Sequence, residues 1–276
     1  QITGDLAFSE IENFNIFGGL ALAGITGIVV IGGLKRIAEV ATFLVPLMGS
    51  IYFGAMIVAL ILNLNLVLPA FKLIFVDAFN GTAIAGGTFF GVLIYGVRRG
   101  AFSNEAGMGT ESLVHGVAKV SNPVKQGLVA MTGPIFDTLI ICTATALMIL
   151  VSGVWETSSS QGVTLTAEAF SILLGNFGGL ILFVCVICFG LSTIFTYSYY
   201  GASCSRFLFG KFGMKFYIYL YILSIFIYSI VPIDIAINIA DGAFAMMAIP
   251  TLISALWLAP KVMQASKNYF KLIDNN

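Results

Sequence analysis

The stretch "RRGAFSNEAGMGTES", residues 98–112, places charged residues and glycines inside an otherwise apolar part of the chain. Of the 276 residues, 59% are hydrophobic and only 9% are charged, whereas soluble domains carry about a quarter charged residues. This composition predicts an all-α polytopic membrane protein. Charged groups at membrane depth are costly and usually face a bundle interior or a cavity. The polar stretch therefore marks an interior, functional position.

The same stretch predicts a broken helix. Each of Gly107 and Gly109 weakens a helix by about 1 kcal/mol relative to alanine. A break at membrane depth frees backbone N–H and C=O groups, which a ligand, an ion or neighbouring helices must satisfy. A half-helix starting near Thr110 would direct N–H groups and its positive dipole end at a carboxylate, as discontinuous helices of secondary transporters do.

Close helix packing is the competing explanation for the glycines of this span. It accounts well for the small residues that precede the polar stretch, Gly86, Gly87, Gly91, Gly96 and Gly100. It does not account for Asn104, Glu105, Thr110 and Glu111, for which we favour a functional role. Whether Arg99 and Glu105 form a purely structural pair stays open.

Apolar runs of roughly 20 residues predict about seven spans: 16–33, 38–63, 85–118 (interrupted), 126–152, 176–205, 214–233 and 238–260. Basic residues gather in alternate connections, at Lys35, Arg36, Lys119, Lys125, Arg206, Lys211, Lys215, Lys261, Lys267 and Lys271, while the other loops carry Lys72 alone. The positive-inside rule then predicts a multi-pass protein of the cell membrane with a cytoplasmic C-terminus. An amphipathic helix expected at 166–174 would be external, as surface cover or as a gate.

Several classes of function are disfavoured. Equal numbers of acidic and basic residues, 13 each, argue against a nucleic-acid partner. Cys185 and Cys188 have metal-ligand spacing but lack companions, so we expect buried helix residues. His115, the single histidine, is expected to be hydrogen-bonded rather than a proton relay. No P-loop and no catalytic constellation is present, so we expect neither an enzyme nor a cofactor.

The quoted stretch, with "NPVKQGLVAM" and "FDTLIICTATALMIL" after it, resembles the alanine or glycine:cation symporter family. "IGGLKRIAEVATFLVPLMGSIY" and "DGAFAMMAIPTLI" fit the same pattern in the same order. The resemblance implies a leucine-transporter-type (APC) fold of two inverted five-helix repeats. It also implies symport of alanine or glycine with Na⁺ as the coupling ion.

The resemblance also implies a set of site residues. Substrate contacts are expected at Asn104, Glu105, Gly107, Met108, Gly109, Thr110 and Tyr197, and cation contacts at Ser192 and Thr193. Independently of the resemblance, Asp137 is expected to line the ion path, because an isolated intramembrane carboxylate needs a partner, a cation or a proton. Hydroxyls such as those of Ser192 and Thr193 alternatively bond back to their own helix. Asp137 could instead pair with a basic residue of a neighbouring helix. Tyr197 stands where similar proteins carry Trp, which leaves the exact substrate open.

On this interpretation the chain divides into 1–63, the last two spans of one repeat; 64–84, an external loop with a short helix; 85–260, the second repeat; and 261–276, a cytoplasmic tail. The N-terminal helices of the first repeat would be missing partners of the same protein, so we expect the isolated chain not to transport. The alternatives are a proton-coupled or broader-specificity carrier of the same fold, and a transport-incompetent or channel-like membrane subunit. An intramembrane enzyme is disfavoured because His115 lacks catalytic companions.

Overall fold

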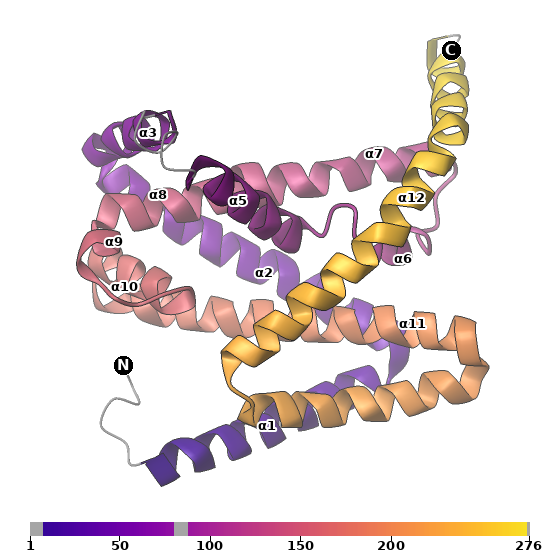
Figure 1. Ribbon diagram of the computed structural model, residues 1–276, viewed down its shortest axis with the longest axis horizontal. Coiled ribbons are helices and arrows are strands. Elements are labelled where there is room, and N and C mark those ends of the chain that lie inside the picture. The colour runs from indigo at the N-terminus through magenta and orange to yellow at the C-terminus, as the bar shows by residue number, and fades with distance from the viewer. Residues whose placement is uncertain (1–7, 80–87, 275–276) are drawn as a thin grey trace. The chain divides into compact units, whose positions relative to one another are not determined.

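The computed structural model describes residues 8–79 and 88–274, without the side chains of residues 8–13, 34, 88, 89 and 234. Across these ranges every element is helical (Figure 1). Gly86 and Gly87, at the expected start of the third span, lie outside the described residues. The all-helical prediction is therefore confirmed for the described part of the chain.

The helices follow the predicted spans closely. Their bounds are α1 (Phe8–Val30), α2 (Gly33–Leu62), α3 (Leu64–Ala78), α5 (Thr88–Asn104), α6 (Thr110–His115), α7 (Pro123–Pro134), the π-helix η1 (Ile135–Cys142), α8 (Thr143–Ser152), α9 (Val154–Thr157), α10 (Val163–Leu174), α11 (Asn176–Ile230) and α12 (Ile233–Asp274). α11 is bent at Gly210, which has φ 70° and ψ −159°, and so covers two predicted spans. α12 continues helically through most of the predicted tail at 261–276.

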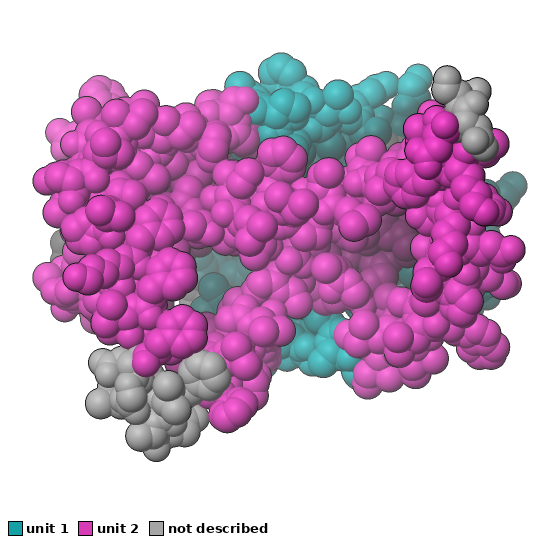
Figure 2. All heavy atoms as spheres, turned by 90° about the horizontal axis from the view of Figure 1, so that it is seen from above, with its two compact units in different colours: residues 1–47, 187–247 teal, residues 48–186, 248–276 magenta. Residues whose placement is uncertain are grey.

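By their internal contacts the residues form two compact units (Figure 2). Unit 1 holds residues 1–47 and 187–247, and unit 2 holds residues 48–186 and 248–276. This division into two units does not test internal symmetry, so the inverted repeat stays a prediction.

The core of unit 2 joins α2, α8 and α10. The Tyr52 ring stacks on Phe170 with centroids 5.5 Å apart, and its hydroxyl lies 2.8 Å from the Thr145 hydroxyl. Met56 of α2 and Met148 of α8 are fully buried. A polar pair that satisfies itself inside an apolar cluster fixes the register of α2 against α8 without leaving an unpaired group.

Unit 1 is built around the hairpin of α11. Its second arm lies against the first (Figure 1), and the Tyr221 hydroxyl donates to the Ile194 carbonyl at 2.8 Å. Tyr217 packs directly on Gly201, where any side chain would collide with the ring. The buried cluster of Val30, Ile37 and Phe195 ties the first arm to α1 and α2.

The described surface is that of a membrane protein. Four helical stretches are long and apolar enough to cross a bilayer: 35–62, 123–152, 176–230 and 235–274. Large apolar side chains project outward along them, including Phe43 (72% exposed) and Trp257 (81% exposed). Such a surface is unfavourable in water but suits hydrocarbon.

Candidate substrate and ion site

The third span is interrupted where the sequence predicts it. α5 ends at Asn104, α6 begins at Thr110, and the five residues between them have no helical assignment. Figure 1 shows this segment as an irregular connection between the two helices. The predicted break of the helix near residues 107–110 is therefore present.

Left-handed backbone at three positions produces the break. Gly107 and Gly109 have φ of 83° and 87°, and Glu105 has φ 54°. Glycine adopts these angles without steric cost, whereas Glu105 is strained there. Gly109 also lies against α12: a Cβ on it would come within 2.8 Å of the Thr251 hydroxyl oxygen. Both conformation and space therefore require glycine at position 109.

Some backbone groups freed by the break find partners inside unit 2. The Ala106 N–H donates to the Asn104 side-chain oxygen at 2.9 Å, and the Met108 N–H donates to the Glu105 carbonyl at 3.1 Å. Thr251 donates its hydroxyl to the Met108 carbonyl at 3.3 Å. The first N–H groups of α6 have no partner within the helix, as at every helix start, and Gly109 supplies no capping side chain.

Thr110 is the buried polar residue at this point. Its side chain is 1% exposed, and its hydroxyl has no hydrogen-bond partner. A buried hydroxyl without a partner costs roughly 1–3 kcal/mol, so a ligand that bonded it would recover that free energy. α6 has only six residues, and its dipole is therefore much weaker than that of a full-length half-helix.

The fourth span changes from α-helix to π-helix where it contacts the end of α5. Residues 135–142 form a π-helix directly after Gly133-Pro134, a geometry often found at functional positions. Ser103 donates to an Asp137 carboxylate oxygen at 2.7 Å, and the Asn104 amide donates to the Thr138 hydroxyl at 2.9 Å. Asp137 thus contributes to a cluster of polar oxygens at the break.

The alternative of a salt bridge to Asp137 has no support in the described ranges. Its carboxylate there accepts hydrogen bonds from two hydroxyls, those of Ser103 and, at 3.4 Å, Thr138. Hydroxyl and carboxylate oxygens are the ligands that a hard cation such as Na⁺ prefers. Among the described residues no group of three or more His, Cys, Asp or Glu could hold a metal.

The remaining predicted residues belong to unit 1. Ser192 is 7% exposed and donates to the Phe189 carbonyl at 2.8 Å, which is the backbone bond that an isolated membrane serine makes. Thr193 faces outward. The Tyr197 ring contacts Tyr200, 5.3 Å between centroids, and Phe244, at 6.3 Å. The cation role of the hydroxyl pair and the substrate role of Tyr197 stay predictions.

Comparison with known proteins decides the family. A profile of the sodium:alanine symporter family matches residues 3–276. The chain belongs to the sodium:alanine symporter family. The family is named for sodium and alanine symport, the class of function that the sequence led us to expect.

Individual members of the symporter family align over nearly the whole chain. The uncharacterized transporter YflA of Bacillus subtilis is 36% identical over 96% of this chain and 58% of its own length. The sodium/alanine symporter AgcS of Methanococcus maripaludis is 35% identical, covering 99% of this chain and 61% of that protein. The probable sodium/glutamine symporter GlnT of B. subtilis is 33% identical, covering 91% and 53%. The chain thus spans between half and two thirds of the length of these relatives.

Other polar residues of this symporter-family chain have structural roles. The Gln126 amide donates a hydrogen bond to the His115 ring nitrogen Nδ1 at 2.7 Å, as expected for a hydrogen-bonded histidine. Cys185 is buried, with its sulfur 4.0 Å from the Met48 carbonyl oxygen, which fits a helix residue. Asp241 is buried and lies inside α12, which begins at Ile233, so it is beyond the first turn where a carboxylate interacts with the helix dipole.

Two contributors to the site were not predicted. Ser103 lies inside the quoted polar stretch, but its partner Asp137 is 34 residues away and only the fold brings them together. Thr251 follows Pro250, and a proline within a helix removes a backbone donor and marks an irregular position. That proline is the sequence signal that could have drawn attention to Thr251.

Proposed function

We propose that the protein couples the movement of Na⁺ to the uptake of a small neutral amino acid, alanine or glycine, by alternating access. The observation that carries the proposal is the left-handed break of the third span beside the buried, unpartnered hydroxyl of Thr110. An unwound backbone at membrane depth is stable only where a partner satisfies it. A zwitterionic amino acid is such a partner.

The proposed substrate contacts follow from the chemistry of the break. The substrate carboxylate accepts hydrogen bonds from the N–H groups at the start of α6 and from the Thr110 hydroxyl, which has no other partner. Charge-assisted bonds of this kind are about twice as strong as neutral ones. Carbonyl groups freed by the break are the proposed acceptors for the substrate ammonium group.

The proposed ion contacts lie around Asp137. A Na⁺ ion would take oxygens from the carboxylate and from the Ser103 and Thr138 hydroxyls, which already lie within 3.4 Å of it. Bound cation would replace the hydroxyl protons as the partner of the carboxylate. Ser192 and Thr193 are proposed as a second set of cation contacts in unit 1.

The proposed setting is a leucine-transporter-type inverted-repeat fold in the cell membrane, with the C-terminus in the cytoplasm. The alternation of connections rich in basic residues with connections that carry only Lys72 supports the orientation, and broken helices at the substrate site are how such folds build their binding sites. Rocking of one bundle against another would then open the break to each side in turn.

Uptake of radiolabelled alanine by the protein in proteoliposomes tests the function. We expect uptake to require an inward Na⁺ gradient, to vanish when choline replaces Na⁺ at fixed pH, and to be competed by glycine. Uptake that persisted in choline and followed a proton gradient would establish the proton-coupled alternative. Competition by glutamine, the substrate in the name of one relative, would establish broader specificity.

Substitution of Thr110 tests the site. Loss of one bond to a charged group costs roughly 1.5–3 kcal/mol, so Thr110→Val should raise the alanine Kd by about 10- to 100-fold, and Thr110→Ser should keep it. Unchanged affinity in Thr110→Val would remove the residue from the site.

A further inference from the structure

The turn at Gly210 in α11 combines aromatic and basic side chains. Residues 206–216 read "RFLFGKFGMKF", with a basic residue next to a phenylalanine at each end and in the middle. Phe207 is 89% exposed and Phe212 is 82% exposed. Neither the break in the third span nor the proposed transport cycle uses this turn.

The charge at the turn has a single sign. Arg206, Lys211 and Lys215 are all exposed, and no Asp or Glu occurs between Glu168 and Asp234 in the sequence. Lys211 and Lys215 are one helical turn apart and share a face of the second arm. The turn therefore presents an uncompensated positive surface to any anion.

An apolar pocket of about 430 Å³ lies directly beside these charges, between the two arms of α11. Phe209 of the first arm and Phe212, Phe216 and Tyr217 of the second form its walls. Gly213 allows the two arms to pack closely, because a Cβ at this position would collide with Phe209. The pocket is thus part of the hairpin and follows from its packing.

We propose that this turn binds one anionic phospholipid of the bilayer. Arg206, Lys211 and Lys215 contact the phosphate, and an acyl chain enters the pocket between the arms. The turn joins two membrane-spanning arms and so lies at the bilayer surface, where basic residues attract anionic headgroups. If these basic residues only set the orientation of the protein in the membrane, the aromatic pocket beside them would have no explanation. If the ligand were a free phosphate ion, the exposed phenylalanines would gain no apolar partner.

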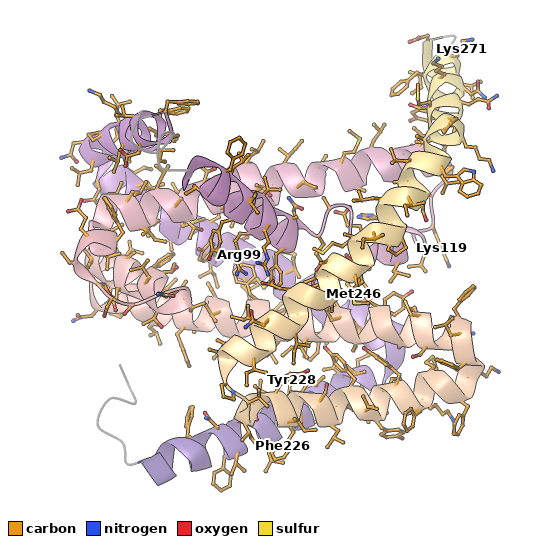
Figure 3. The ribbon with its side chains drawn as sticks, viewed as in Figure 1. Arg99, Lys119, Phe226, Tyr228, Met246 and Lys271 are labelled. Carbon is orange, nitrogen blue, oxygen red and sulfur yellow. The ribbon has the colours of Figure 1, made fainter. Side chains whose placement is uncertain are left out.

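Native mass spectrometry of the purified full chain in mixed micelles tests the proposal, with phosphatidylglycerol as the anionic probe and phosphatidylcholine as the neutral one. The test variant carries Arg206→Gln, Lys211→Gln and Lys215→Gln. Its matched control carries Lys119→Gln, Lys267→Gln and Lys271→Gln, which removes the same charge from exposed positions elsewhere (Lys119 and Lys271 are labelled in Figure 3). All six side chains are exposed, so both variants should fold.

We expect the wild-type chain to retain one phosphatidylglycerol in preference to phosphatidylcholine, and the control to do the same. Because each basic residue near a membrane surface contributes about the same attraction to an anionic lipid, loss of all three should weaken phosphatidylglycerol binding roughly 100-fold. A Phe212→Gln variant should also weaken retention, since it makes the pocket wall polar. Equal loss in the test and control variants, or equal retention of the neutral lipid by the wild type, would overturn the proposal.

Discussion

Replacing Gly109 with alanine tests the conformation on which the site depends. Gly109 has φ 87°, and an L-residue in left-handed backbone costs about 1–2 kcal/mol relative to glycine. The new Cβ would also lie 2.8 Å from the Thr251 hydroxyl oxygen, and such overpacking adds about 1–3 kcal/mol. We therefore expect Gly109→Ala to lower the free energy of unfolding by about 2–5 kcal/mol, because both penalties act at once.

Gly91→Ala is the matched control, because Gly91 lies within α5 and has open space around its Cβ position. Alanine is favoured over glycine inside a helix by up to about 1 kcal/mol, so this variant should be neutral or stabilised. The double variant Gly109→Ala/Thr251→Ala should recover the contact penalty but keep the backbone penalty, because removing the hydroxyl leaves φ unchanged. The assay is denaturation in detergent followed by circular dichroism. Equal stability of Gly109→Ala and Gly91→Ala would refute the left-handed backbone.

Three further changes test other parts of the structure. Hydrogen bonds from the Ser158 and Ser160 hydroxyls hold the pKa of Glu168 below that of a free glutamate, so the loop before α10 should lose protection from amide exchange as the pH falls through this lowered pKa; Glu168→Gln should remove this pH dependence. Tyr221→Phe deletes the 2.8 Å bond of its hydroxyl to a backbone carbonyl and should destabilise the α11 hairpin by about 1 kcal/mol in the same denaturation assay; no change would mean that water replaces the bond. Asn122→Ala removes the N-cap bond to the Val124 N–H and should cost about 1 kcal/mol, whereas Asn122→Ser should cost less.

The sequence predicts the fold well where a long apolar pattern carries the signal. Spans, their order and the interrupted third span follow from hydrophobicity and from Gly107 and Gly109, because lipid allows few alternatives to a helix. The π-helix at residues 135–142 was not predicted, since its i→i+5 bonding leaves no periodic mark in a fully apolar run.

The candidate site was predicted only where its residues are neighbours in sequence. Residues 104–110 lie in one polar stretch, so their shared position could be recognised from composition alone. The bond from Ser103 to Asp137 and the contact of Thr251 with Met108 join segments that are far apart in the chain. Such pairs depend on helix packing, which a single sequence does not specify.

Solid-state NMR of the protein in bilayers tests the central claim most directly, with ¹³C and ¹⁵N labels at residues 103–112. We predict helical chemical shifts through Asn104 and from Thr110 onward, non-helical shifts at residues 105–109, and changes at the Gly109 and Thr110 amides when alanine is added with Na⁺. Helical shifts throughout residues 103–112, unchanged by alanine, would contradict the account.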